Sequence, residues 1–390
     1  MQMNRRSKFE WPAGPHAERA GREAAEFGLN IVGPKCIVLA SLLLSPIGCG
    51  DGPESPSGEW LRDADYPLDI GANGTPGYML EDIVLRPGVT VDIFVNVYGD
   101  IESKNCQLAI HGGVFAAASW RPYAEALGED ACVLAPDMPV RGNSGVPSGA
   151  QFGDLDLFDY VTAIERIIER LHELDVEPKT ILGHSMGGTL VQMLQQRLVS
   201  QGSSLEDRYD IDEAILVASD LPAEVPWALG DSGDLTGLIE AFAINHPEHG
   251  VLFSIPVSLW PAFYFTDRNG NPIANSLTAE QIEAGGFNAL GEPLNAIHQL
   301  NGTGGYPSRP SAAANLFLDD TRLRVIAYEE DIYVQLAESE ALYQHLTGDS
   351  SSSCFVPVYG PDTGHVLQFS NPQALVDAIA ASENCDYPHD

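Results

Sequence analysis

The segment that most constrains the fold is Thr-Ile-Leu-Gly-His-Ser-Met-Gly-Gly-Thr-Leu at residues 180–190. Its order is a short apolar strand, a Gly-x-Ser-x-Gly turn and the start of a helix, which predicts a sharp turn with Ser185 at its apex. Such a turn strains the serine backbone and lifts the hydroxyl out of the sheet. A side chain at Gly183 or Gly187 would collide with the neighbouring strand or helix.

Helices are predicted on both sides of this turn. Residues 157–174 carry apolar side chains at helical spacing, among them Phe158 and Ile164, and residues 188–199 form a second helical pattern. Because the five-residue pattern alone is weak, this helix–strand–turn–helix context carries the interpretation. The alternative is a glycine-bounded turn without chemistry.

Two further segments place polar residues at strand ends. A buried strand at 323–327 leads into an acidic cluster that ends at Asp331, and a strand at 355–359 leads into a loop that contains His365. The carboxyl ends of the strands are where sites form in open α/β sheets. The chain order is therefore serine, acid, histidine, with Asp331 146 residues after Ser185 and His365 34 residues further on.

These residue types suit nucleophilic catalysis by serine. A serine hydroxyl needs a base of pKa about 7, and an imidazole fits that need. A carboxylate on the other ring nitrogen fixes the tautomer and stabilises the imidazolium. The oxyanion that develops needs two fixed N–H donors. Met186, which follows the serine, is one candidate, and the His-Gly-Gly loop after the strand at 108–110 supplies Gly113 as the first choice for the other and Val114 as the second.

Taken together, these segments resemble the α/β-hydrolase superfamily, in its esterase, lipase and peptidase branch. The segment from Asp137 to Ser144 also resembles that family's Asp-x-x-Gly-x-Gly-x-Ser loop. The matching segments are residues 111–113, 137–144 and 183–188, the strand that ends near Asp331, and Gly364-His365.

The resemblance implies an α/β fold with a mostly parallel, doubly wound sheet and an inserted cap. It covers residues 76–220 and 312–390 as the core, and the insertion at 221–311 occupies the family's usual place for a cap, or lid. That insertion is rich in aromatic residues. We expect most of them to form the cap's own core and a minority to line the substrate pocket.

The acid is the member of the implied triad of Ser185, Asp331 and His365 for which the sequence offers alternatives. The family usually has a glycine three residues before the acid, and Tyr328 occupies that position here. Asp331 is favoured by alignment, with Asp220 after the preceding strand and Glu330 as the alternatives. In a chain this acidic, Asp331 could also be a solvated turn carboxylate.

No metal site or cofactor is expected. His246 and His249 have a spacing that can bind a metal on a helix, but Pro247 interrupts the segment and no third ligand is evident. Gly-rich phosphate-binding motifs are also missing from the sequence.

The net charge is strongly negative. It is −35 for the whole chain, and residues 49–390 alone carry 14 basic and 51 acidic residues. A surface of this sign repels nucleic acid and anionic membranes. It suits an extracellular or saline setting, where salt screens the self-repulsion.

The N-terminal segment predicts export. An apolar run at 37–47 is too short to span a bilayer and is typical of a secretory signal. Gly48-Cys49 and the Gly/Ser/Pro-rich residues after it resemble a bacterial lipoprotein signal with a flexible tether, so we expect a leader at 1–48, lipidation of Cys49 and a tether at 49–75. Pro46 departs from the usual leucine, and we expect translation to start near Val32. The alternatives are an uncleaved anchor and a buried first helix.

The remaining cysteines also favour an oxidising compartment. With Cys36 removed and Cys49 lipidated, four cysteines remain, and three pairings are possible. In the fold that the resemblance implies, the strands that begin near Cys106 and Cys132 are parallel neighbours, and the last helix returns to the start of the last strand. We therefore expect the disulfides 106–132 and 354–385, with buried free thiols as the alternative.

Two classes of function follow from the sequence. The first is a serine hydrolase that acts on small-molecule carboxylic esters, or, as an alternative, an aminopeptidase-type amide hydrolase of the same fold. The second is a non-catalytic surface-binding protein. An intact set of serine, histidine, acid and donors favours the first class. No nucleic-acid partner is expected, membrane association is expected only through the lipid anchor, and the oligomeric state is open.

The export hypothesis predicts that the mature, cell-associated chain begins at a lipidated Cys49. Stable retention needs more than one acyl chain, because a single chain binds a membrane only marginally. Mass spectrometry of the mature N-terminus measures this directly. An intact peptide that spans Cys49, or recovery of the protein in the cytoplasm, contradicts the hypothesis.

Overall fold

The computed structural model describes residues 30–31, 37–38, 68–71, 74–102, 105–229, 234–273, 291–317, 321–361, 363–382 and 385. The chain divides into two compact units, Met1–Glu54 and Ser55–Asp390. In the first unit, β1 (Asn30–Ile31) and β2 (Ile37–Val38) pair antiparallel. The rest of the predicted leader, Cys49 and most of the tether lie outside the described residues.

The second unit is built on one nine-stranded sheet, with the strand order β14-β13-β9-β8-β6-β7-β5-β4-β3. The strands from β14 to β7 in this order run parallel, and β5, β4 and β3 continue the sheet antiparallel. The predicted mostly parallel sheet is thus confirmed. The strands are β3 (Asp69–Ile70), β4 (Pro76–Arg86), β5 (Val89–Gly99), β6 (Cys106–Ile110), β7 (Cys132–Pro136), β8 (Pro178–His184), β9 (Glu213–Val217), β13 (Arg322–Tyr328) and β14 (Phe355–Val358).

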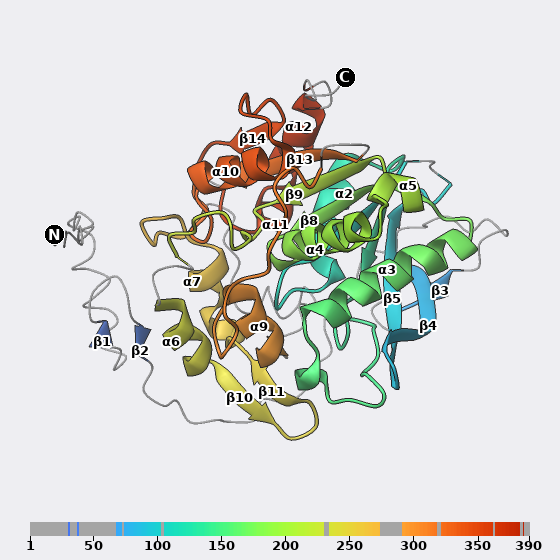
Figure 1. Ribbon diagram of the computed structural model, residues 1–390, viewed down its shortest axis with the longest axis horizontal. Helices are drawn as coiled ribbons and strands as arrows, with labels where there is room; N and C mark the ends of the chain where they lie inside the picture. Colours follow the sequence, from blue (N-terminus) through green and yellow to red (C-terminus); the bar gives the residue numbers. More distant parts are fainter. Residues whose placement is uncertain are drawn as a thin grey trace. The chain divides into compact units, whose positions relative to one another are not determined.

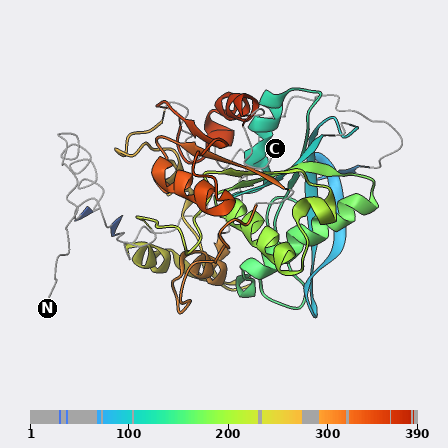
Figure 2. The ribbon, with the colours of Figure 1, turned by 45° about the horizontal axis from the view of Figure 1, so that its top comes forward.

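Helices cover both faces of this sheet, as Figures 1 and 2 show. One face carries α3 (Leu157–Glu173), α4 (Met186–Ser200), α5 (Leu205–Tyr209) and α10 (Leu336–Thr347). The other face carries α2 (Arg121–Leu127), α11 (Leu367–Ser370) and α12 (Pro372–Ala381).

Side chains that alternate along each central strand separate the two hydrophobic cores. Leu108 and Ile110 of β6 belong to the core under α3 and α4, whereas Ala109 belongs to the core under α2 and α12. This alternation follows from the two-residue period of a strand. A strand buried on both faces therefore has a nearly continuous apolar sequence, as β6, β7 and β9 do.

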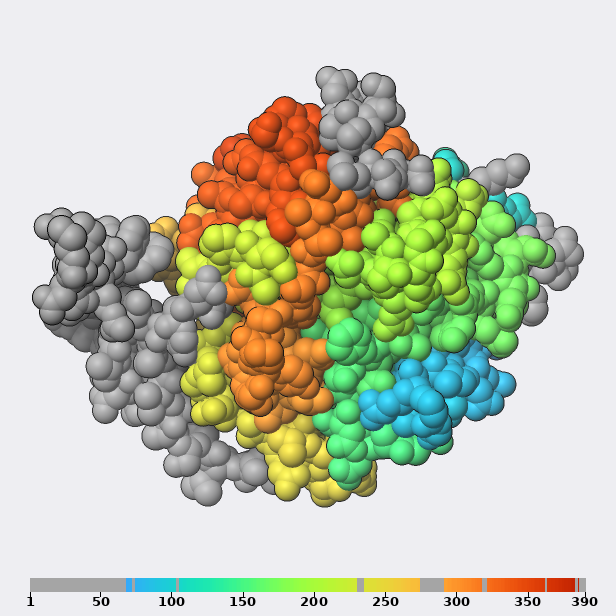
Figure 3. Space-filling view, viewed as in Figure 1, coloured from blue at the N-terminus to red at the C-terminus, as the bar shows by residue number. Residues whose placement is uncertain are grey.

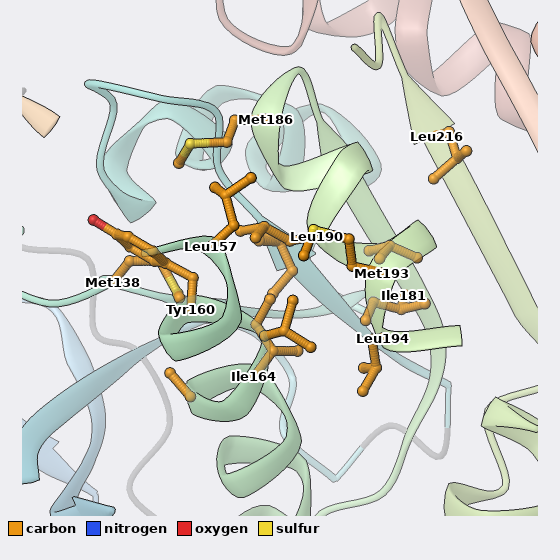
Figure 4. Close-up of a cluster of buried hydrophobic side chains, with 14 of the residues drawn as sticks. Met138, Leu157, Tyr160, Ile164, Ile181, Met186, Leu190, Met193, Leu194 and Leu216 are labelled. Carbon is orange, nitrogen blue, oxygen red and sulfur yellow. The ribbon is translucent and has the colours of Figure 1, made fainter. Parts of the chain in front are cut away.

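The apolar stripe of α3 packs beside α4, over the sheet (Figure 4). Helix α3 begins where Asp156 accepts the N–H of Asp159, a capping interaction that satisfies a free amide of the first turn. Ile164 is fully buried, as its spacing predicts. Phe158, which the same pattern assigns to the buried stripe, is instead 56% exposed. Its neighbours Leu157 and Tyr160 in the same turn are buried, so Phe158 points to the opposite side of the helix.

Two disulfides confirm the predicted pairing. Cys106 and Cys132 lie directly opposite each other in the β6–β7 register, with their Cα atoms 4.5 Å apart. Cys354 and Cys385 join the start of β14 to the segment after α12, with a Cα distance of 5.3 Å. Each bond links segments that the fold already brings together.

The residues between β9 and β13 form a separate layer of structure (Figures 1 and 3). A three-stranded sheet in the order β10-β11-β12 lies with short helices, and we call this part the cap. Its elements are α6 (Asp234–Ala241), β10 (Ala243–His246), β11 (Gly250–Phe253), α7 (Trp260–Tyr264), β12 (Glu292–Pro293) and α9 (Leu294–Asn301). Among the described residues, no helix combines the length and hydrophobicity that crossing a membrane requires.

Candidate active site

Ser185 lies at the sharp turn between β8 and α4, as the sequence predicts. Its backbone is at φ 52° and ψ −123°, a region that a residue with a side chain rarely adopts. A hydrogen bond from its N–H to Val217 O, 3.0 Å long, ties the turn to β9. The strain persists because the surrounding sheet and helix determine the position of the turn.

The two glycines of this turn allow β8, β6 and α4 to approach closely. A Cβ atom on Gly183 would lie 2.6 Å from Gly187 O, and one on Gly187 would lie 2.5 Å from Ile110 O. Both contacts are with backbone atoms, which cannot move aside. Glycine is therefore required at both positions for a steric reason.

Ser185, His365 and Asp331 form a continuous chain of hydrogen bonds. The His365 Nε2 atom is 3.0 Å from Ser185 Oγ, and His365 Nδ1 is 2.9 Å from Asp331 Oδ2. The other Asp331 oxygen accepts the N–H groups of Tyr333 and Val334, at 2.7 and 3.2 Å. The carboxylate is thus fixed on the side of the imidazole that faces away from the serine.

The other two candidate acids lie elsewhere. A Glu330 oxygen accepts the backbone N–H of Arg268 at 3.3 Å, which ties it to the cap and away from the imidazole. Asp220 follows β9 and is buried, but no hydrogen bond joins it to His365 among the described residues. Burial raises the pKa of Asp220 to about 6; His365 opposes this rise and Asp331 adds to it.

The electrostatic setting makes His365 a stronger base than an isolated imidazole. Burial alone would lower its pKa, but the charge and hydrogen bond of Asp331, with a smaller contribution from Asp220, raise the pKa of His365 above its ordinary value. The carboxylate therefore favours the protonated ring. This is the form that a general base takes after it has removed a proton.

Two backbone N–H groups near Ser185 have no acceptor among the described residues. Met186 is the first residue of α4, where amides have no partner within the helix, and the positive end of the helix dipole lies there. Gly113 lies beside it, since a Cβ on Gly113 would be 3.6 Å from Met186 Sδ. The N–H of Val114, by contrast, already donates to Glu292 Oε1 at 2.8 Å.

Two further histidines hold the loops around the site. His111 Nε2 accepts the N–H of Met138 at 3.2 Å, so its Nδ1 carries a proton and donates to Gly112 O at 2.8 Å. His184 donates from Nε2 to the carbonyl of His365 at 2.8 Å. Burial lowers the pKa of both rings, more strongly for His184, so both stay neutral and act as fixed hydrogen-bonding groups.

Asp137, in the loop after β7, holds several backbone segments around the site by hydrogen bonds. Its carboxylate accepts the N–H of Ala117 and of Asn143, at 2.9 and 3.0 Å, and an amide hydrogen of Asn96 at 2.9 Å. These bonds connect the loop after β7 with β5 and with the segment that follows the oxyanion loop. Asp137 therefore orders the backbone around the site without contacting Ser185.

Aromatic rings from the cap and the core lie close to His365. Tyr264 of α7 in the cap lies 6.4 Å from the His365 ring and 4.9 Å from Phe115, and Tyr333, which follows β13, lies 4.6 Å from His365, measured between ring centroids. Other cap rings pack against each other, as Phe242 does with Phe263 at 5.6 Å. The cap thus packs aromatic rings against each other and also places Tyr264 against His365.

The described residues contain no group of three or more metal-ligating side chains. His246 and His249 stack with their ring centroids 4.6 Å apart, and His246 Nδ1 accepts the backbone N–H groups of residues 248 and 249, both at 3.3 Å. That nitrogen is therefore used within the turn.

Comparison with known proteins identifies the class. A model of the alpha/beta hydrolase family matches residues 108–378, and the chain belongs to this family. The sheet order, the strained serine turn and the positions of Asp331 and His365 after the last two strands agree with that assignment. A search of curated proteins found no match.

Solved structures share this fold at low sequence identity. A bromoperoxidase from Bacillus anthracis has a TM-score of 0.55 at 14% identity, over 78% of this chain and 99% of its own. A putative lipase from Acinetobacter baumannii AYE has a TM-score of 0.54 at 17% identity, over 79% and 90% of the two chains. The 2-hydroxy-6-oxo-6-phenylhexa-2,4-dienoate hydrolase of Rhodococcus sp. strain RHA1 has a TM-score of 0.51 at 18% identity, over 78% and 99%.

Sequence reasoning did not identify the cap residues that touch the loops of Asp331 and Val114. Arg268 donates from Nε to the carbonyl of Asp331 at 3.1 Å, and Glu292 accepts the N–H of Val114. Tyr333, which packs on His365, was also missed. A charged residue in the cap sequence is a weak indication of a contact with the site, because only the tertiary fold shows which group its side chain meets.

The close approach at the serine turn predicts that Gly187→Ala lowers stability. The new Cβ must push backbone of β6 away, and overpacking of this kind costs about 1–3 kcal/mol. Gly237→Ala is the matched control, since Gly237 is in α6 and a Cβ there meets nothing within 4 Å. We expect thermal unfolding to shift down for Gly187→Ala and to stay the same or rise for Gly237→Ala. Equal melting temperatures for wild type and Gly187→Ala contradict this account of the turn.

Proposed function

We propose that this protein is a serine hydrolase that cleaves small-molecule carboxylic esters through an acyl-enzyme on Ser185. The observation that carries the proposal is the hydrogen-bonded series from Asp331 through His365 to Ser185, next to two N–H groups without acceptors. No cofactor or metal takes part in this proposal.

In the first half of the reaction, Ser185 Oγ attacks the ester carbonyl carbon while its proton passes to His365 Nε2. The carbonyl oxygen becomes an oxyanion, which the N–H groups of Gly113 and Met186 bind. The ester C–O bond then breaks, and His365 returns the proton to the departing alcohol. Asp331 stays ionised and stabilises the imidazolium throughout.

In the second half, water replaces the alcohol. His365 removes a proton from the water as the water oxygen attacks the acyl carbon, and the same two N–H groups bind the second oxyanion. Collapse breaks the bond to Ser185 Oγ, which regains its proton from His365. The products are a carboxylic acid and the free enzyme.

Two considerations support an ester as the substrate class. The triad and oxyanion donors suit acyl transfer in general, and an alkoxide is an easier leaving group than an amide anion. The putative lipase among the structural neighbours agrees with this choice. At 17% identity that neighbour shows the fold alone, so the site chemistry carries the argument.

We also propose that the mature protein is exported and held by lipid on Cys49. The two disulfides support this location, since such bonds persist in oxidising compartments. The strongly acidic composition agrees with a setting outside the cytoplasm.

If Ser185 is the nucleophile, Ser185→Ala removes nearly all ester turnover while the protein stays folded. Loss of a triad member leaves only the part of the rate that binding and the oxyanion hole provide, so kcat falls by several orders of magnitude. The assay uses p-nitrophenyl esters of increasing chain length beside aminoacyl anilides, which also separates ester from amide preference. Ser200→Ala, at the exposed end of α4, is the control.

A fluorophosphonate probe gives a second measurement of the same proposal. It should attach to Ser185 in the wild type and in Ser200→Ala, and to neither serine in Ser185→Ala. Labelling of a different serine, or normal turnover by Ser185→Ala, shows that the proposed nucleophile is wrong.

Replacing Asp331 and replacing Asp220, the two buried carboxylates near His365, should change the kinetics differently. Asp331→Asn should lower kcat by orders of magnitude, because the amide holds the imidazole in the wrong tautomer. The neutral ring is the active base, so kcat/KM falls as the pH drops through the pKa of His365. Since Asp331 raises this pKa and Asp220 raises it less, Asp331→Asn moves the acid limb further toward low pH than Asp220→Asn does.

The measurement is the pH dependence of kcat/KM for the wild type and for each of the two variants. We expect Asp220→Asn to keep its plateau within a few fold of the wild type. A large loss of kcat in Asp220→Asn, with a small one in Asp331→Asn, would make Asp220 the acid and leave the fold and the reaction unchanged.

A further inference from the structure

A fully buried ion pair joins the cap to the core beside the proposed oxyanion hole. Arg141 follows β7 and Glu292 begins β12 of the cap, with 2.6 Å between Arg141 Nη2 and Glu292 Oε1. Both side chains are 0% exposed. Removing two charges from water is costly, and a buried pair is weak evidence of stability by itself. Stability alone therefore does not explain why the pair is present at this position.

Both oxygens of the Glu292 carboxylate are used in this position. Oε1 accepts the N–H of Val114 at 2.8 Å, and Oε2 accepts the hydroxyl proton of Tyr160 at 2.7 Å. Arg141 also donates to the carbonyl of Gly291, the residue before Glu292. One carboxylate from the cap thus fixes the loop after β6, the helix α3 and the loop after β7 relative to each other.

The loop that Glu292 holds is strained at Val114. Its φ of 61° lies in the left-handed region, which is a true outlier for a β-branched residue. A conformation of this kind costs about 1–3 kcal/mol and persists only where its surroundings enforce it. The hydrogen bond from the Val114 N–H to a buried carboxylate is a contact able to enforce it.

This contact also determines which N–H of the loop stays available. The Val114 N–H points to Glu292 and is occupied, whereas Gly113, one residue earlier, has no acceptor among the described residues. A Cβ on Gly113 would lie 3.9 Å from Glu292 Cγ, so the carboxylate side chain lies directly against this residue. Because neighbouring peptide planes share one Cα atom, fixing the Val114 N–H restricts the direction of the Gly113 N–H.

We propose that Glu292 is a positioning residue that sets the oxyanion loop, and that Arg141 neutralises its charge there. This inference rests on the proposed function, because it assigns Gly113 as a donor to the oxyanion. Glu292 does not touch the substrate and acts through Val114 and Gly113.

The role of Arg141 follows from electrostatics. An uncompensated carboxylate next to a developing oxyanion would raise the energy of the transition state, since like charges repel strongly where water is excluded. The guanidinium bonds to the same Oε1 atom that accepts the Val114 N–H, which places the positive charge where it cancels the negative one. The carboxylate can then order the loop without opposing the reaction.

The chain offers a matched control for a purely structural role. Arg324 and Glu213 form another buried ion pair, between β13 and β9. Glu213 is the first residue of its strand, so this pair lies at the end of the parallel strands opposite to Ser185. A change there removes a buried ion pair of the same kind and leaves the oxyanion loop intact.

The experiment compares three double variants of the full chain. Arg141→Met/Glu292→Met removes both charges and the acceptor for the Val114 N–H, with little change in volume. Arg141→Met/Glu292→Gln also removes both charges but keeps an amide oxygen as the acceptor. Arg324→Met/Glu213→Met is the control. Replacing both partners of each pair avoids leaving an unpaired buried charge.

Each variant is measured in two ways. Hydrogen–deuterium exchange of the peptide that covers residues 111–116 reports the order of the loop without any substrate. The kcat and KM for a p-nitrophenyl ester report the oxyanion hole. A misplaced donor lowers kcat and leaves KM nearly the same, because the oxyanion exists only after binding.

The proposal expects the Met/Met variant at 141 and 292 to exchange faster in the loop and to lose about 100-fold in kcat, with KM within about threefold of the wild type. Arg141→Met/Glu292→Gln should keep kcat within about fivefold of the wild type. The control Arg324→Met/Glu213→Met should keep kcat within about twofold of the wild type, even if its melting temperature falls. Equal kcat for the Met/Met and Met/Gln variants, or unchanged loop exchange in the Met/Met variant, overturns the proposal. Because exchange needs no turnover, it decides this inference even if wild-type protein cleaves no ester, a result that contradicts the proposed function instead.

Discussion

The contact between strand β8 and helix α4 at Ser185 is the constraint on which the rest of the site depends. It requires Gly183 and Gly187, whose absent side chains let backbone atoms approach within contact distance. The turn they permit places Ser185 at the positive end of α4, beside the Met186 N–H. Hydrogen bonding to His365 and Asp331 then follows from the parallel order of β9, β13 and β14, whose loops all open at the same edge.

The cap takes part in this arrangement at two points. Arg268 donates to the carbonyl of Asp331, and Glu292 accepts the N–H of Val114. One contact holds the loop of the proposed acid and the other holds the loop of the proposed oxyanion donor. A cap in this family is expected to shape the pocket that receives the substrate. In this protein it also contacts the segments that position the proposed catalytic groups, so cap variants should affect kcat as well as substrate choice.

The sequence predicted the parts of this structure that depend on local patterns. The strand–turn–helix at Ser185 follows from an apolar run and glycine spacing, whereas the sheet and both disulfide pairings were expected from the resemblance to the α/β-hydrolase superfamily. The predicted burial of Phe158 was wrong, because its position on the helix points away from the face that Leu157 and Ile164 bury, although Phe158 is itself apolar. Glu292 was missed for a related reason. A glutamate 178 residues from Val114 gives no local signal, and only the tertiary fold shows that its carboxylate faces that amide.

A crystal structure of the phosphonylated protein tests the central claim most directly. The phosphonyl oxygen takes the place of the oxyanion once phosphorus is bonded to Ser185 Oγ. The account predicts this oxygen at about 2.7–3.1 Å from both the Gly113 and the Met186 nitrogen atoms, with the Val114 N–H still bonded to Glu292. A phosphonyl oxygen that is bonded to the Val114 nitrogen, or that points away from both Gly113 and Met186, would contradict the account.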